Sequence, residues 1–139
     1  MEKLITAFLV LGIICSLGSG LKEDKMTRVL RAIRIVESNN NPDAVGDNGN
    51  AIGVYQIWEV YWKDGTEYSG IGGKYLDCYD PDYADRIVRA YMDRYATEKR
   101  LGRPVTMEDI ARIHNGGPNG YKKKSTLGYW SKVKCHIGG

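Results

Sequence analysis

Two carboxylates, Glu37 and Asp47, stand ten residues apart in unlike surroundings. Glu37 ends an apolar helical pattern, whereas Asp47 lies in a loop rich in Asn, Asp and Gly. Cleavage of a bond between two sugars needs one carboxyl group that donates a proton to the leaving oxygen and a second that stays ionised. The pair therefore predicts glycosidic-bond hydrolysis, with Glu37 as general acid and Asp47 as nucleophile or electrostatic stabiliser.

The expected surroundings suit these roles. A helix C-terminus is electronegative and an apolar helix edge excludes water, so both favour a neutral Glu37 carboxyl group. N–H groups of residues 48–50 can hydrogen-bond Asp47 and favour its ionised form. In a retaining enzyme the two carboxyl groups should lie about 5–5.5 Å apart. A purely structural interpretation competes, because a glutamate at a helix end is usually solvated and an aspartate before Asn-Gly usually belongs to a turn.

Apolar periodicity predicts the elements that position the pair. A helix should begin after an Asp24 cap and end at Asn39-Asn40-Asn41-Pro42. Residues 43–57 are rich in turn formers and predict a small hairpin or irregular lobe, and residues 63–79 predict a loop. Further helices are expected over residues 56–62, from Pro81, from a capping box at residues 106–109, and over residues 127–133. The expected fold is α+β and mainly helical, with a small β lobe.

The chain has 139 residues and a net charge of +3, which fits one domain and suits approach to an acidic polymer. Leu4 to Leu17 is nearly all apolar and small residues follow it, which predicts a signal peptide over residues 1–20 and a secreted domain over residues 21–139. The apolar run is short for a membrane span, so no stable membrane association is expected after cleavage. An uncleaved signal anchor is the alternative.

Cys78 and Cys135 remain in the mature chain, and an oxidising compartment favours a disulfide between them over two free buried thiols. His114 and His136 are too few and too badly spaced for a zinc site. The sequence has no Walker motif or dinucleotide fingerprint. We therefore expect no metal, cofactor or nucleic-acid partner, and the sequence leaves the oligomeric state open.

Several segments occur in order along nearly the whole mature chain: Gly53-Val54-Tyr55-Gln56-Ile57 with Tyr61-Trp62-Lys63-Asp64, Arg89–Tyr95, Ala111–Gly120, and Ser125–Val133. They resemble the GPYQIKEPYWID, YMKRY, HNGGP-x-G and ST-x-GYW-x-KV segments of the invertebrate-type (i-type) lysozymes, the destabilase family. The resemblance implies a lysozyme-like single domain. It also implies hydrolysis of the β-1,4 bond between N-acetylmuramic acid and N-acetylglucosamine in bacterial peptidoglycan.

By this resemblance, Glu37 takes the position of the proton donor and Asp47 that of the second carboxylate, at a spacing about one residue shorter than usual. The resemblance implies substrate-binding roles for ten residues: Trp58, Glu59, Tyr61, Trp62, Lys63, Asp64, Tyr95, His114, Asn115 and Gly116. The chain departs from the family in cysteine content, because the family is usually dense in disulfides. Its stability must therefore come more from the core.

Three alternatives stay open. The run from Glu37-Ser38 to Ile57 also resembles goose-type lysozymes and lytic transglycosylases, where a single glutamate suffices. A catalytically silent wall-binding lectin would bind saccharide without cleaving it. Some family members are described as isopeptidases, which would need Ser38, Ser125 or Ser131 paired with His114 or a lysine. No serine here lies in a nucleophile-elbow pattern, so this would be a minor second activity.

Overall fold

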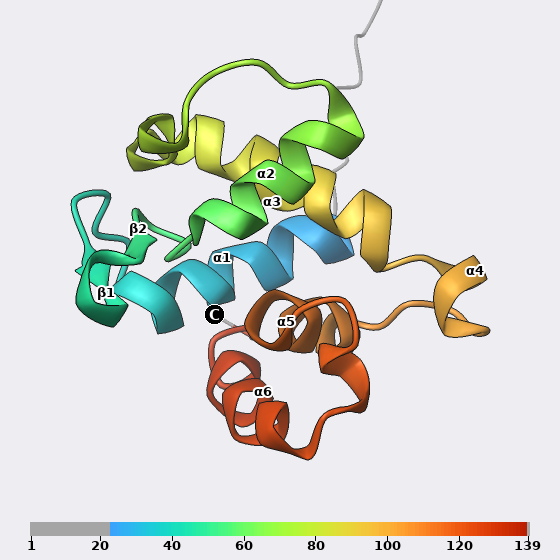
Figure 1. Ribbon diagram of the computed structural model, residues 1–139. Helices are drawn as coiled ribbons and strands as arrows, with labels where there is room; N and C mark the ends of the chain where they lie inside the picture. Colours follow the sequence, from blue (N-terminus) through green and yellow to red (C-terminus); the bar gives the residue numbers. More distant parts are fainter. Residues whose placement is uncertain (1–22, 139) are drawn as a thin grey trace, which may run out of the picture.

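The computed structural model describes residues 23–138 (Figure 1). Its helices are α1 (Lys25–Ser38), α2 (Glu59–Ser69), α3 (Pro81–Tyr95), α4 (Glu98–Leu101), α5 (Met107–Gly116) and α6 (Leu127–Lys134). Two antiparallel strands, β1 (Val45–Gly46) and β2 (Ala51–Ile52), form a small lobe in which Val45 pairs with Ile52. The fold also contains four short 3-10 turns: η1 (Asp47–Gly49), η2 (Tyr75–Tyr79), η3 (Gly120–Lys122) and η4 (Lys124–Thr126). The predicted mainly helical α+β fold is confirmed.

Helix α1 runs through the middle of the molecule, with α2 and α3 on one side and α5 and α6 on the other (Figure 1). The Asp24 carboxylate accepts a hydrogen bond from Thr27 N at 3.0 Å and caps the helix, as predicted. The helix ends where Asn39 adopts a left-handed conformation, with φ of 53°. Glu37 is therefore in the last turn, beside the β lobe.

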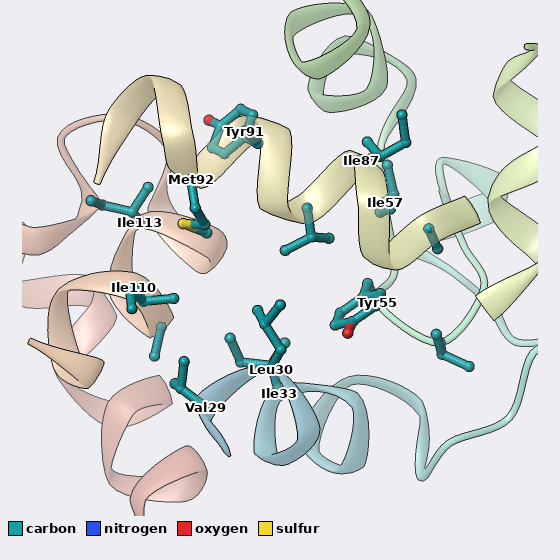
Figure 2. Packing of buried hydrophobic residues seen from close by; sticks show 14 of the residues in the cluster. Val29, Leu30, Ile33, Tyr55, Ile57, Ile87, Tyr91, Met92, Ile110 and Ile113 are labelled. Atoms are coloured by element: carbon teal, nitrogen blue, oxygen red, sulfur yellow. The ribbon is translucent and has the colours of Figure 1, made fainter. Parts of the chain in front are cut away.

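The core forms where α1, α3 and α5 meet the segment that follows β2 (Figure 2). Each element contributes apolar residues that are almost fully buried, including Val29, Leu30, Ile33, Tyr55, Ile57, Ile87, Met92, Ile110 and Ile113. Burial of a large aliphatic or aromatic side chain stabilises a fold by roughly 1.5–3 kcal/mol. This core holds α1, α3 and α5 together and so fixes the last turn of α1, where Glu37 lies.

The predicted loop over residues 63–79 is wrong in its first part, because α2 continues to Ser69. Gly65 explains the difference, since it is buried where α2 packs on α3. A Cβ atom at this position would lie 3.1 Å from Ile87 O, so the glycine allows the two helices to approach closely. The glycines of residues 63–79 therefore have two different roles: Gly65 allows a close contact between two helices, and those after Ser69 belong to a loop.

The Cys78–Cys135 disulfide favoured from the sequence is not formed in the structure, where both thiols are free. Cys78 is buried in η2, and burial raises the pKa of its thiol to about 12. Cys135 is exposed just after α6, and its Sγ contacts Ser131 O at 3.2 Å. The prediction fails because η2 and α6 lie on opposite sides of α1 (Figure 1).

The predicted signal peptide, residues 1–20, lies outside the described residues. Among the helices of residues 23–138, none is both long enough and apolar enough to cross a membrane.

Candidate active site

A cleft of about 470 Å³ opens where the end of α1, the β lobe, α2 and the end of α5 meet. Seven of the residues singled out from the sequence line it: Glu37, Asp47, Trp58, Tyr61, Asp64, His114 and Asn115. Five lining residues were not singled out from the sequence: Gln56, Val60, Tyr91, Gly117 and Pro118. The structure thus brings both candidate catalytic carboxylates to one concave surface.

Glu37 lies in the wall of the cleft, with its side chain 20% exposed. Its Oε1 accepts a hydrogen bond from the Tyr129 hydroxyl at 2.7 Å, and His114 Nε2 lies 3.5 Å from the same oxygen. Burial, together with the nearby Glu37 carboxylate, raises the pKa of Tyr129 well above its ordinary value. Tyr129 therefore stays protonated and remains a hydrogen-bond donor to Glu37.

His114 is buried behind Glu37, with its side chain only 4% exposed. Its Nε2 lies 3.1 Å from Tyr55 O, and its Nδ1 lies 3.1 Å from the Tyr61 hydroxyl. A carbonyl oxygen can only accept, so Nε2 carries a hydrogen and donates it to Tyr55 O. The ring of Tyr61 stacks on Tyr91 at a centroid distance of 3.7 Å. His114 is thereby fixed in orientation from both ring nitrogens.

Asp47 also lines the cleft, in the turn between β1 and β2, and is exposed. Its Oδ2 accepts a hydrogen bond from the Trp58 indole Nε1 at 3.2 Å. The donors expected from residues 48–50 do not fill this role, since Asn50 Nδ2 donates to the main-chain oxygen of Asp47 instead. Asp47 and Asn48 have φ of 48° and 55°, a conformation that is costly for residues other than glycine.

Gln56 connects this turn to the rest of the protein. Its side-chain Nε2 donates to Ala44 O at 3.1 Å and to Gly53 O at 3.0 Å. Its Oε1 lies so close to Gly46 that a Cβ there would approach within 2.3 Å. Gln56 itself has a positive φ of 51°. These contacts fix the segment just before Asp47 to Gln56, which lines the cleft.

Asp64 is fixed at the edge of the cleft by two neighbours from α3. Arg94 Nη1 donates to Asp64 Oδ1 at 2.5 Å, and the Tyr95 hydroxyl donates to Oδ2 at 2.7 Å. Tyr95 was predicted to contact substrate, but here it is a partner of Asp64 and does not line the cleft. Asp64 therefore offers a preoriented acceptor to a ligand.

Four other predicted substrate-binding residues do not line the cleft. Glu59 and Lys63 form an exposed ion pair at 3.0 Å along α2. Trp62 turns to the opposite face of the helix, where its Nε1 donates to the Tyr83 hydroxyl at 2.9 Å. Gly116 packs against Thr126, where a Cβ would approach within 2.5 Å. Helical periodicity explains the division along α2, because Val60, Tyr61 and Asp64 share the face toward the cleft.

Two of the three serines considered for an isopeptidase pair have other partners. Ser38 Oγ donates to Arg34 O and Val54 O, and Ser131 Oγ donates to Leu127 O. Within residues 23–138, no hydrogen bond joins His114 to a serine.

Comparison with known proteins gives consistent matches. Residues 26–135 match the Destabilase family. A lysozyme of Magallana gigas is 41% identical over 112 residues, which span 75% of this chain and 74% of that protein. A lysozyme of Meretrix lusoria is 43% identical over 89 residues, or 60% of this chain and 69% of that protein. The crystal structure of an inhibitor-bound lysozyme from Meretrix lusoria aligns with a TM-score of 0.65 at 40% identity, covering 78% of this chain and 87% of that chain.

Proposed function

Because the chain belongs to the destabilase family of invertebrate-type lysozymes, we propose that it hydrolyses the β-1,4 bond between N-acetylmuramic acid and N-acetylglucosamine in bacterial peptidoglycan. Family membership makes the chain a glycoside hydrolase. The bond, the catalytic residues and secretion to reach the wall are our proposal. The observation that carries it is the position of Glu37 and Asp47 in one cleft, each with different partners.

Glu37 acts as the general acid. Tyr129 and His114 both lie against Oε1, which leaves Oε2 to hold the proton and donate it to the glycosidic oxygen. A protonated carboxyl group can accept one hydrogen bond and donate another at the same time, since Oε1 accepts from Tyr129 while Oε2 donates. Tyr129 is thus a positioning residue that fixes which oxygen of Glu37 meets the substrate.

Asp47 acts on the other side of the scissile bond. The Trp58 indole binds Oδ2, so Oδ1 is the oxygen that attacks or stabilises the positively charged sugar. The strained turn and the Gln56 side chain keep Asp47 facing the cleft. For a retaining reaction the two carboxyl groups should be about 5–5.5 Å apart with sugar bound, which stays a prediction.

The cleft surface suits a saccharide. Trp58 is 44% exposed and Val60 is 70% exposed at its rim, and such apolar surfaces pack on the C–H faces of sugar rings. Asp64 is fixed by its two α3 partners and can accept hydrogen bonds from sugar hydroxyl or amide groups.

The chemical nature of the products tests this proposal. Purified peptidoglycan is digested with the protein, and the released ends are identified by mass spectrometry. Hydrolysis predicts reducing N-acetylmuramic acid ends. Ends in the 1,6-anhydro form would identify the single-glutamate transglycosylase reaction instead, and saccharide binding without any cleavage would leave a lectin.

A further inference from the structure

A single side chain connects two parts of the protein that meet at the cleft but are far apart in the sequence. Arg100 lies in α4, an exposed turn of helix that Figure 1 shows at the edge of the molecule. Its Nη1 donates to Tyr95 O at 3.0 Å and to Pro118 O at 2.7 Å, and its Nη2 donates to Asn119 Oδ1 at 3.1 Å. Arg100 thereby bridges the end of α3 and the turn that follows α5.

On the α3 side, Arg100 is anchored to the residue that orients Asp64. The Tyr95 hydroxyl donates to Asp64 Oδ2 at 2.7 Å, and the centre of its ring lies 4.8 Å from that of Tyr91, which lines the cleft. The Arg100 guanidinium lies 5.4 Å from the centre of the same Tyr95 ring. Tyr95 O belongs to the last turn of α3, where a carbonyl has no partner within its own helix, and Arg100 satisfies it.

The second anchor is the turn at residues 117–119, which depends on Arg100 for its link to the rest of the protein. Gly117 and Pro118 line the cleft. Gly117 has a φ of 82°, a conformation that glycine adopts readily, and proline has no N–H to donate. Among the described residues, Arg100 supplies the only hydrogen bonds that reach this turn from outside the segment from α5 to η4. Without Arg100, hydrogen bonds within that segment alone would hold the turn.

The anchor at Asp64 is remote from the second candidate carboxylate. Trp58, which donates to Asp47, is the N-cap residue of α2, and Asp64 lies further along the same helix. At 1.5 Å of rise per helical residue, Trp58 and Asp64 are about 9 Å apart along α2. Figure 1 shows the β lobe and α4 on opposite sides of the molecule. The bridge made by Arg100 therefore acts on a part of the cleft away from Asp47.

We propose that Arg100 is a positioning residue that fixes the Gly117–Pro118 turn relative to Asp64, and so determines how tightly the cleft binds a chain of N-acetylated sugars. This inference rests on the proposed function, which assigns the cleft to such a saccharide. A wall that is ordered before binding loses less conformational entropy on binding than one that the ligand must order. The two catalytic carboxylates keep their own hydrogen-bond partners, so the bridge acts on saccharide binding and not on the chemical step.

Three variants of the full chain separate the parts of the bridge. Arg100→Ala removes all of it. Arg100→Lys keeps the charge, but one ammonium group does not reproduce the planar fork that reaches three acceptors from two nitrogens. Asn119→Ala removes one acceptor of the turn and leaves the two main-chain carbonyls. Steady-state turnover of soluble peptidoglycan strands gives kcat and KM, and calorimetry measures binding of the trisaccharide of N-acetylglucosamine.

Arg103→Ala is the matched control. Arg103 follows α4 in the same connection between α3 and α5, is exposed like Arg100, and does not line the cleft. It donates to Pro104 O and, through both Nη atoms, to the Asp109 carboxylate. The control therefore removes the same charge and the same number of hydrogen bonds as Arg100→Ala. A general loss of stability would affect both variants, whereas a change in the cleft would affect only one.

The proposal predicts a change in KM without a matching change in kcat. In Arg100→Ala, KM and the dissociation constant of the trisaccharide should rise by about tenfold, with kcat within about twofold of the wild type. Arg100→Lys and Asn119→Ala should each raise KM by about threefold, and Arg103→Ala should keep the wild-type KM. Arg100→Ala combined with Asn119→Ala should be no worse than Arg100→Ala alone, because both changes remove the same interaction.

Several results would overturn the proposal: a wild-type KM in Arg100→Ala, an equal rise in the Arg103→Ala control, or independent effects of the Arg100 and Asn119 changes. A lower kcat with unchanged KM would also contradict it, since Arg100 would then act on the reaction. If the wild type cleaves no peptidoglycan, the proposed function fails, and trisaccharide binding by the variants still decides the role of Arg100. A wild type that neither cleaves peptidoglycan nor binds the trisaccharide would overturn both.

Discussion

Tyr129→Phe tests the account of the general acid most specifically, because it removes one hydroxyl group and leaves the aromatic ring. The hydroxyl donates to Glu37 Oε1 at 2.7 Å in a partly buried environment. As Glu37 gives up its proton it becomes a carboxylate, and a hydrogen bond to a charged group contributes roughly 1.5–3 kcal/mol. At about 1.36 kcal/mol for each factor of ten in rate, kcat should fall by about 10- to 150-fold. KM should change by less than about threefold, because Tyr129 does not line the cleft.

Tyr83→Phe is the matched control. The Tyr83 hydroxyl makes two hydrogen bonds, accepting from Trp62 Nε1 and donating to Gly72 O, and neither reaches the cleft. Both variants should lose about 1 kcal/mol of unfolding free energy in urea denaturation, whereas only the Tyr129 variant should lose kcat on peptidoglycan. A folded Tyr129→Phe protein with wild-type kcat would refute the positioning role, as would an equal loss of kcat in both variants.

Four further changes test the surroundings of the site and the core. Trp58→Phe removes the indole donor to Asp47, so steady-state assays should show kcat reduced by about tenfold with an unchanged unfolding temperature. Gln56→Ala removes two hydrogen bonds to the β lobe and should also lower kcat by about tenfold; wild-type kcat would show that the lobe needs no such contact. Gly65→Ala brings a Cβ against the α3 backbone and should lower the unfolding free energy in urea by about 1–3 kcal/mol, unless α2 can shift. Burial alone would raise the pKa of the Asp109 carboxyl group, but hydrogen bonds from its arginine and threonine neighbours outweigh burial and lower the pKa below 3.8. The stability that these bonds contribute is therefore present above pH 3.8 and is lost as the pH falls through the lowered pKa. Asp109→Asn should therefore flatten the loss of stability with acid in denaturation measured against pH.

Local patterns predicted the elements whose causes are local. The Asp24 cap, the apolar face of α1 and the left-handed end at Asn39 depend on neighbours within a few residues, and they place Glu37 correctly in a last turn. The capping box that begins α5 is also local, with Thr106 and Asp109 bonded reciprocally. These features were therefore visible in the sequence.

Contacts between residues that are far apart in the sequence could not be predicted from local patterns. Tyr129 lies 92 residues from Glu37, and only a family resemblance singles out its segment, so no residue pattern in the sequence links it to the acid. Trp62 was grouped with its neighbours as a sugar contact, but the direction of its side chain depends on the rotation of α2 against α3. The buried Gly65 likewise depends on how closely those two helices pack. Tertiary packing, which local propensity does not encode, decided these positions.

The central claim is that Glu37 and Asp47 act together as acid and second carboxylate. Turnover of purified peptidoglycan by Glu37→Gln and Asp47→Asn tests it most directly, with circular dichroism to establish that both variants fold. The account predicts that kcat falls by at least about a hundredfold in each variant, since each removes a group that acts on the reacting bond. Wild-type lysis by the Glu37 variant would contradict the claim outright, and wild-type turnover by the Asp47 variant would reduce the mechanism to a single acid.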